Sequence, residues 1–282
     1  MEGPFPEVDY LVLGHVTQDL TPAGPQPGGT ATFASLTAQA VGLRPGIVTA
    51  TGGGALPTVL AHLPARSIAS EYSTTFRNDY EGGRRRQMVL SVAARLSLAA
   101  VPPEWRSAPI VHLAPLAREV DPELAGLFPS SFVGLTAQGW LRQWDAAGRV
   151  AVAPWPEAEP ALRAASAVVI SREDMQGDAD ILRSWAGWAR VLVVTAGAEG
   201  ATVYVDGQAR HFPAPQVPEV DPTGAGDIFA AVYFALLRET ADPWAAAEPA
   251  VALASASVGH AGLSGIPGSE AVRAALPGRR LK

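Results

Sequence analysis

The chain has 282 residues, 48% of them hydrophobic and 17% charged, so one or two domains with a substantial buried core are expected. Acidic residues outnumber basic ones 27 to 21, and the formal charge of −6 argues against a broad nucleic-acid-binding face. There is no cysteine, which excludes disulfides, thiolate nucleophiles and cysteine-ligated zinc.

The N-terminal stretch MEGPFPEVDYLVLG carries acids where a signal peptide needs a basic flank. No apolar run in the chain approaches the roughly 18 residues that indicate a membrane-spanning helix. We therefore expect a soluble, cytoplasmic protein that binds neither membranes nor nucleic acid.

Strand-like apolar segments recur along the chain and alternate with helical or loop material. Residues 10–14 are apolar and continuous, as in a central strand that is buried on both faces. The other segments predicted as strands are 46–51, 109–113, 132–135, 167–171 and 191–195. The segments predicted as helices are 32–41, 178–189 and 227–238. This alternation predicts an α/β architecture with a mainly parallel sheet.

Two segments interrupt this alternation. Residues 72–92 have β-prone flanks around Glu81-Gly82-Gly83, which predicts a hairpin turn. Residues 201–212 carry Asp206-Gly207 between alternating flanks, which is a stronger hairpin signal. The proline- and alanine-rich residues 151–165 are interpreted as a connector followed by a helix. The whole chain, 1–282, is therefore expected to form a single domain.

Lysine is nearly absent, which limits the classes of phosphate-binding enzyme to which the chain can belong. It occurs once, as the last residue Lys282, whereas arginine occurs twenty times. P-loop proteins, protein kinases and Schiff-base enzymes all need an internal lysine, so these three classes are excluded. The histidines show no metal-binding spacing such as H-E-x-x-H, and no G-x-S-x-G elbow supports a hydrolase triad.

The stretch DPTGAGDIF, Asp221 to Phe229, lies at the start of the predicted helix 227–238. Small residues there let backbone amides approach a ligand closely, and the helix dipole favours an anion. The motif leaves two interpretations of Asp227 open. It is either a helix cap, or a base that accepts a hydroxyl proton beside a bound phosphoryl group.

This stretch closely resembles the C-terminal signature of the ribokinase-like (PfkB) carbohydrate kinases, whose common form is D-T-x-G-A-G-D. The resemblance implies that Asp227 is the catalytic base and that Gly224, Ala225 and Gly226 form an anion hole for the transferred phosphoryl group. It also implies the fold of that family, a three-layer sandwich in which helices flank a mainly parallel central sheet, with a small β lid.

Two segments near the N-terminus match the same family in the expected order. LGHVTQD, which ends at Asp19, resembles the opening strand with its hydroxyl-binding acid, although a solvated loop acid is the alternative. PGGTATF resembles the turn before the first helix and implies that Gly28, Gly29 and Thr30 bind the substrate. A double glycine alone can also be only a turn.

The segment SRED, Ser171 to Asp174, falls where the family has N-x-x-E, a motif that orients Mg²⁺. The resemblance implies that Asp174 faces the cation, because hard Mg²⁺ prefers carboxylate oxygen. Glu173 is the alternative metal residue, or simply an acid at the start of a helix. Because both motif positions are changed, a ligand-binding pseudokinase remains a rival interpretation.

The nucleotide side of the resemblance rests on two later segments. VTAGAEG, residues 194–200, resembles the family's V-T-x-G-x-x-G strand end, and the small residues of 252–262 resemble a helix that lines an adenine pocket. The residues that the resemblance assigns to ATP are Thr195, Gly197, Gly200, Thr223, Gly224, Gly226 and Ala256.

Arginine has to supply any phosphate clamp in this chain. Arg142, between Trp140 and Trp144, resembles a family element whose arginine contacts phosphate or substrate, and the alternative is a surface arginine packed on tryptophan. Lid elements are expected within 18–30 and 72–92. In the second of these, Arg84-Arg85-Arg86 either meets an anionic substrate or forms a solvated edge.

The sequence thus predicts a kinase that uses ATP and Mg²⁺ to phosphorylate a hydroxyl group of a small polyol or sugar, acting as a monomer or homodimer. Pro222 and the GGTATF stretch resemble the myo-inositol-kinase branch, so myo-inositol is a named candidate. A nucleoside kinase of the same family is the alternative enzyme. A dinucleotide-binding oxidoreductase lacks support, because no G-x-G-x-x-G follows the first strand.

Overall fold

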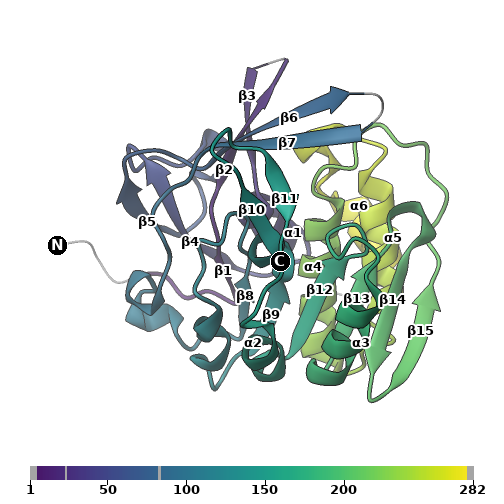
Figure 1. The fold of residues 1–282 in the computed structure, drawn as a ribbon. Coiled ribbons are helices and arrows are strands. Elements are labelled where there is room, and N and C mark those ends of the chain that lie inside the picture. Colours follow the sequence, from purple (N-terminus) through teal and green to yellow (C-terminus); the bar gives the residue numbers. More distant parts are fainter. Residues whose placement is uncertain (1–4, 23, 82–83, 278–282) are drawn as a thin grey trace.

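The computed structural model describes residues 5–22, 24–81 and 84–277, and its centre is one large sheet (Figure 1). Across this sheet the strands follow the order β15 (Gln208–Phe212), β14 (Ala201–Val205), β13 (Leu192–Thr195), β12 (Ala167–Ser171), β9 (Phe132–Thr136), β8 (Ile110–Leu113), β1 (Tyr10–Leu13), β4 (Pro45–Gly52) and β5 (Ala65–Ser70). The pairs from β13 to β5 are parallel, whereas β14 and β15 are antiparallel. The predicted mainly parallel α/β sheet is confirmed.

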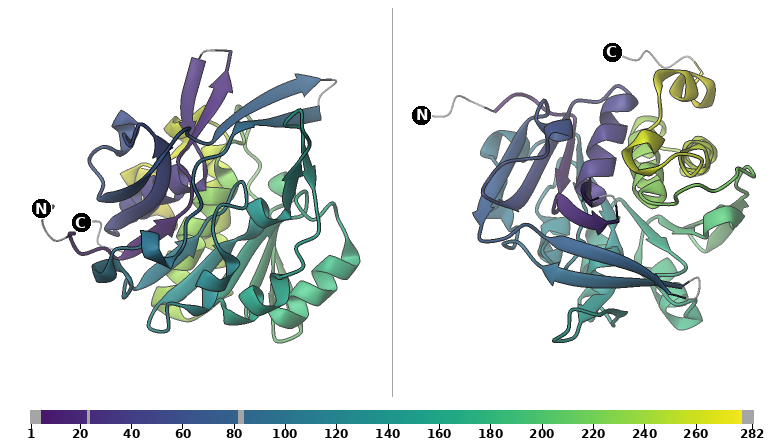
Figure 2. Two further views of the ribbon diagram at one scale, coloured as in Figure 1. Left: turned by 60° about the vertical axis from the view of Figure 1, so that its left-hand side comes forward. Right: turned by 90° about the horizontal axis from the view of Figure 1, so that it is seen from above.

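Helices cover both faces of this sheet (Figure 2). One face packs against α1 (Thr30–Ala40), α4 (Ala225–Thr240), α5 (Ala247–Ser257) and α6 (Ser269–Ala275). The other face packs against α2 (Ala158–Ala164), α3 (Ala179–Trp188) and short 3₁₀ turns at 98–100, 103–105 and 122–126. The result is the three-layer sandwich that the family resemblance implies.

Strand β1 shows why helices pack on both faces of the central sheet. All four of its residues are buried, and neighbouring side chains of a strand point to opposite faces. Tyr10 and Val12 enter the core with α1 and α4, whereas Leu11 and Leu13 enter the core with α2 and α3. A continuous apolar strand is therefore matched by an apolar layer on each side.

Helix α4 is the central helix of the first layer. The ten consecutive residues Ile228–Leu237 are all buried, so the helix has no solvent-facing stripe over this stretch. It packs between α1 and α5 and against the sheet. This burial holds the start of α4 at a defined position above the carboxyl ends of the parallel strands.

A second, smaller sheet joins segments that are far apart in the sequence. Its strands follow the order β3 (Gly24–Gly28), β2 (Thr17–Thr21), β6 (Thr75–Glu81) and β7 (Arg84–Ser91). Figure 1 shows it at the top of the molecule, and the predicted segments 18–30 and 72–92 thus lie together. The hairpin of β10 (Arg142–Trp144) and β11 (Val150–Val152) adjoins β7, because Val89 N donates to Gly148 O at 2.8 Å.

Both predicted hairpins have paired flanks. The Asp206-Gly207 turn is confirmed, since φ is 48° and 75° at its two residues, as a two-residue primed turn requires. For the other hairpin, β6 and β7 pair antiparallel, while Gly82 and Gly83 of the predicted turn lie outside the described residues. The side chains of Arg84-Arg85-Arg86 also lie outside the described part.

The predicted helix at 227–238 begins earlier, at Ala225, because Gly224 adopts φ 81° and forms the N-cap. The predicted helix at 32–41 likewise begins at Thr30, after Gly29 with φ 86°. Both glycine turns therefore lie at helix starts. No helix in the described ranges combines the length and apolar character that crossing a bilayer requires.

Candidate active site

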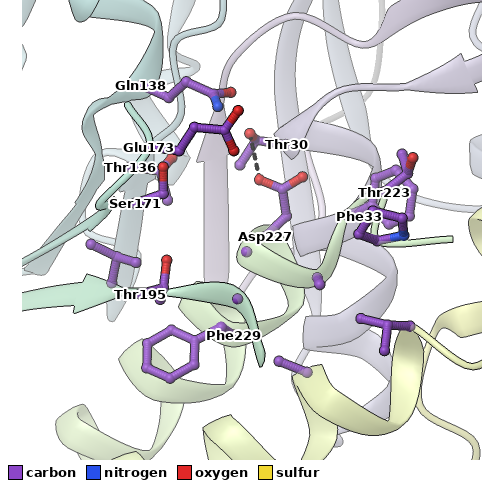
Figure 3. Close-up of a pocket in the computed structure, with 18 of the residues that line it drawn as sticks. Thr30, Phe33, Thr136, Gln138, Ser171, Glu173, Thr195, Thr223, Asp227 and Phe229 are labelled. Carbon is purple, nitrogen blue, oxygen red and sulfur yellow. Dashed lines mark hydrogen bonds between the residues drawn. The ribbon is translucent and has the colours of Figure 1, made fainter. Parts of the chain in front are cut away.

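A cavity of about 820 Å³ opens at the carboxyl ends of the parallel strands. Thr136, Ser171 and Thr195, the last residues of β9, β12 and β13, line it together with the start of α4 (Figure 3). The small sheet contributes Asp19 and Phe76 to its wall. In open α/β sheets this edge is where ligands bind.

Asp227 lies in this cavity, in the first turn of α4. Thr30 Oγ1, at the start of α1, donates a hydrogen bond of 2.7 Å to Asp227 Oδ1 (Figure 3). The N-cap of α4 is Gly224, and no side chain caps that helix. The carboxylate therefore faces the cavity and α1 instead of the amides of its own helix, which favours the base over the cap.

The surroundings of Asp227 change its acidity. Burial raises its pKa from 3.8 to about 6, although the Thr30 hydrogen bond and the positive charge of Arg142 act in the opposite direction. The negative charges of Asp174 and Asp19 add to the increase. A general base works best when its pKa lies near the operating pH, so this environment suits proton abstraction.

The loop before α4 has a geometry that only glycine fits. Gly224 has a positive φ, and a β-carbon at this position would overlap the ring of Phe33 from α1. The Ala225 amide is engaged in this turn, since it donates to Pro222 O at 3.2 Å. Helix geometry leaves the amides of Gly226 and Asp227 without an intrahelical acceptor, so they are the donors that suit an anion.

The residues predicted to bind the substrate gather on the side of the cavity under the small sheet. Asp19, Gly29 and Thr30 line the cavity, and Asp19 Oδ1 accepts a hydrogen bond of 3.0 Å from Thr17 Oγ1. Gly28 lies behind this acid, because a β-carbon there would overlap the Asp19 carboxylate. Gly28 is thus placed to support Asp19 and is not part of the cavity wall.

Arg142 begins β10 and is half-buried at the cavity wall. Its guanidinium donates to Leu116 O at 3.2 Å and lies 5.7 Å from the centroid of the Phe76 ring. This distance is within the range of a cation–π contact. The aromatic partner is therefore Phe76 of the small sheet, and not one of the neighbouring tryptophans that the sequence suggests.

The altered metal motif forms a hydrogen-bonded cluster. The two carboxylate oxygens of Asp174 accept from Gln138 Nε2 at 2.9 Å and from Ser171 Oγ at 2.6 Å. Glu173 has a different position, since its side chain points into the cavity toward the side where Thr30 and Asp227 lie (Figure 3). Within the described residues, no three His, Cys, Asp or Glu side chains come together as a ready metal cluster.

Four residues that the resemblance assigns to ATP also line the cavity wall, namely Thr195, Gly197, Gly200 and Thr223. Ala256 does not line the cavity and is exposed. The residues of this region that line the cavity are instead Val251, Ala254, Ser255 and Val258, which share one face of α5 and its C-terminal end. These positions follow the spacing i, i+3, i+4, i+7, and Ala256 points elsewhere.

Several cavity residues were missed by the sequence analysis. Thr136 is the last residue of β9, and its polar side chain directly after the predicted strand 132–135 is a signal that could have identified it. Gln138 lies close to Arg142 in the sequence, but no motif singles it out. Phe33 lies in the PGGTATF motif, and Phe76 and Gln87 lie in the predicted lid segment 72–92, but the sequence assigns none of the three a contact with the cavity.

Comparison with known proteins adds relatives over most of the chain. Residues 167–268 match the model of the pfkB family of carbohydrate kinases. The chain is 30% identical over 257 residues to a cytidine kinase of Thermococcus kodakarensis, covering 81% of this chain and 88% of the relative. It is 27% identical over 278 residues to a fructokinase of Klebsiella pneumoniae, covering 86% and 89%.

Solved structures share the fold at low sequence identity. One is a variant of a pyrophosphate-dependent myo-inositol-1 kinase, with a TM-score of 0.77, 17% identity, and coverage of 95% of this chain and 99% of the other. Another is the ribokinase of Arabidopsis thaliana in complex with ribose and ATP, with a TM-score of 0.74, 16% identity, and coverage of 96% and 99%. At these identities the likeness shows the three-layer fold alone.

Proposed function

Because the chain belongs to the pfkB family of carbohydrate kinases, we propose that it transfers the γ-phosphoryl group of ATP to a hydroxyl group of a small sugar, polyol or nucleoside. The observation that carries the proposal is Asp227. This carboxylate faces a cavity at the start of a buried helix, is held by Thr30, and has a pKa raised to about 6 by burial. The site thus places a proton acceptor, the Asp227 carboxylate, beside a helix start that can bind an anion.

In the proposed reaction, Asp227 removes the proton of the acceptor hydroxyl as its oxygen attacks phosphorus. The acceptor lies on the side of Asp19 and Thr30, where hydroxyl groups find hydrogen-bond partners. The first-turn amides and the dipole of α4 stabilise charge on the transferring group, with Arg142 as a further donor. The small sheet serves as a lid that excludes water.

A nucleotide fits the donor end of the cavity better than pyrophosphate does. Besides Gly224 and Thr223, the cavity is lined by the apolar side chains of Val217, Val251, Ala254 and Val258. Pyrophosphate has no apolar part to fill this space, whereas a nucleobase does. The structural neighbour that was solved with ribose and ATP supports the same donor, whereas three other neighbouring structures are described as pyrophosphate-dependent kinases.

The residues present fit a magnesium ion held mainly by substrate phosphates. Mg²⁺ commonly takes one or two carboxylates and keeps phosphate and water as its other ligands. Glu173 points a carboxylate into the cavity, and Asp174 lies beside it with both oxygens already accepting hydrogen bonds. We therefore propose Glu173 as the carboxylate nearest the ion and Asp174 as its support. Bound there, the ion would neutralise phosphate charge.

A nucleoside is a specific second candidate for the acceptor. It is supported by the cytidine kinase relative, which matches over most of its length. Sugars are supported by the fructokinase relative, and myo-inositol by the structural neighbour. All of these acceptors present a hydroxyl group, so the proposed chemistry at Asp227 is the same for each.

The test is a screen of ATP turnover with cytidine, other nucleosides, fructose, ribose and myo-inositol, with pyrophosphate as a parallel donor. We expect ATP-dependent phosphorylation of at least one acceptor. Acceptor binding without any turnover would instead support the pseudokinase, and turnover with pyrophosphate alone would overturn the choice of donor.

The pH dependence of kcat/KM should show the ionisation of Asp227. The base acts only when deprotonated, so we expect kcat/KM to fall about tenfold per pH unit below pH 6. Thr30→Val removes a hydrogen bond that favours the charged carboxylate, so the acidic limb should move to higher pH, by about one unit. An unchanged limb in this variant would assign the ionisation to another group.

The role of Glu173 is testable by magnesium titration. Glu173→Gln should raise the Mg²⁺ concentration for half-maximal activity about tenfold, because a neutral amide is a weaker ligand. Glu270→Gln, at an exposed position in α6, is the matched control and should leave it unchanged. Equal magnesium dependence in all three proteins would remove Glu173 from the proposal.

A further inference from the structure

A buried chain of hydrogen bonds runs from the core to the cavity. Tyr10 Oη lies 3.0 Å from His112 Nδ1, and His112 Nε2 lies 3.0 Å from Thr136 Oγ1. The three residues lie on the neighbouring strands β1, β8 and β9. Tyr10 and His112 are fully buried, and only Thr136, at the end of β9, reaches the cavity.

The imidazole of His112 is neutral in this setting. Burial lowers its pKa to about 3, and its ring packs edge-on against Tyr10 and Phe234. Burial also raises the pKa of Tyr10 well above its ordinary value, with the negative charge of Asp227 adding to the effect, so the phenol keeps its proton. A neutral imidazole has one N–H donor and one acceptor nitrogen.

The hydrogen atoms of the Tyr10–His112–Thr136 hydrogen bonds can be arranged in two orders. In the first, the Tyr10 hydroxyl donates to His112 Nδ1, and His112 Nε2–H donates to Thr136 Oγ1. In the second, Thr136 donates to Nε2 and Nδ1–H donates to Tyr10, so the phenol proton needs another acceptor. Among the described residues, His112 is the only hydrogen-bond partner of the Tyr10 hydroxyl. The second order would thus leave a buried donor unsatisfied, which favours the first.

In the first order, Thr136 Oγ1 accepts from His112 and keeps its own hydrogen for another partner. Within the described part of the chain, His112 is also the only partner of the Thr136 hydroxyl. The nearby amide of Gln138 donates to Asp174. The Thr136 hydrogen is therefore available to a ligand in the cavity.

We propose that Tyr10 and His112 hold the Thr136 hydroxyl as a one-directional hydrogen-bond donor that binds a substrate oxygen. This inference rests on the proposed kinase function and adds three residues to its site. Thr136 touches the substrate, and Tyr10 and His112 are positioning residues. The oxygen belongs either to the phosphoryl group of the donor or to a hydroxyl of the acceptor, since both have lone pairs to offer.

The proton order is measurable without any turnover. Nitrogen-15 NMR of the purified protein distinguishes the two imidazole tautomers, and loss of the signal in His112→Gln assigns it. We expect His112 in the Nε2–H form between pH 6 and 8, without titration over this range. Finding the Nδ1–H form, or a charged ring, would overturn the inference.

Kinetics with the acceptor found by the screen tests the role of Thr136. Thr136→Val removes the hydroxyl at constant shape and should lower kcat/KM about three- to tenfold, whereas Thr136→Ser should retain most of it. A rise confined to the KM of ATP identifies a phosphoryl oxygen as partner, and a rise confined to the KM of the acceptor identifies a hydroxyl. An unchanged KM for both substrates with unchanged kcat would contradict the proposal.

A double-mutant cycle tests whether Tyr10 acts through Thr136. Tyr10→Phe should lower kcat/KM in the wild-type background but have no further effect beside Thr136→Val. Tyr233→Phe is the matched control, because its buried hydroxyl donates to Pro243 O in another part of the molecule. Additive losses would mean that Tyr10 is only structural. Absence of turnover in the wild type would instead contradict the proposed function, and the tautomer measurement stays valid in that case.

Discussion

Asp227→Asn should lower kcat by a factor of about 10² to 10⁴ with any acceptor that the protein phosphorylates. The amide has the shape of the carboxylate and can still accept from Thr30 Oγ1, so the positions of α1 and α4 should not change. It cannot accept the hydroxyl proton at neutral pH. Steady-state kinetics at saturating ATP and acceptor measures the effect.

The same variant should fold at least as stably as the wild type at pH 7. The native pKa of Asp227, about 6, is higher than its ordinary value of 3.8, so folding disfavours the charged form. This destabilisation is absent at pH values below 3.8 and fully present above 6, and the asparagine variant lacks it. Thermal unfolding between pH 4 and 8 checks this direction.

Asp180→Asn is the control for a simple loss of charge, because Asp180 is an exposed acid paired with Arg183. It should leave kcat unchanged. If Asp227→Asn and the wild type turn over at equal rates, Asp227 is not the base. If the variant loses activity together with its folded structure, the loss carries no information about proton transfer, and the pH profile of Thr30→Val then decides.

Gly224→Ala is expected to have the second largest effect, on stability as well as on catalysis. A β-carbon at this position meets the Phe33 ring, and the positive φ adds strain. Together these should lower the free energy of unfolding by about 2–4 kcal/mol. Because the first-turn amides would shift, kcat should also fall by about 10² to 10³. Urea unfolding and steady-state kinetics measure the two effects.

Gly226→Ala provides the matched comparison for stability. It lies two residues away in the same motif, but a β-carbon there meets no atom within 4 Å. Since alanine favours a helix over glycine, we expect the same or a slightly higher free energy of unfolding. Equal destabilisation of the two variants would mean that the Phe33 contact is not what requires glycine at position 224.

In the small sheet, the pairing of neighbouring strands could be predicted from the sequence, but the pairing of distant strands could not. The segments 18–30 and 72–92 were each expected to contribute to a lid, and β6 and β7 carry the pattern of a hairpin. Their union depends on the parallel pairing of β2 with β6, which joins Gln18 to Thr75 and Asp19 to Phe76. This pairing joins segments that are far apart in the sequence, so the local pattern of neither segment identifies its partner.

The face of helix α5 that lines the cavity could not be predicted from the sequence. The small-residue segment 252–262 is predicted to line an adenine pocket. In the structure Ala254 and Ser255 line the cavity, whereas Ala256 is exposed. The segment is rich in small residues on every side, so its sequence holds no strong apolar stripe. The face that meets the cavity is set by packing of α5 against α4.

The sequence by itself determined the fold class, the order of the motifs and the candidate base, because these depend on contiguous residues. Buried apolar strands, turn glycines and the DPTGAGD stretch act within a few positions of one another. Only the tertiary structure decided the environment of that base. Thr30 is 197 residues from Asp227, and Tyr10 is 102 residues from His112. Their hydrogen bonds form because the strands and helices that carry them pack together, and burial then raises the pKa of Asp227.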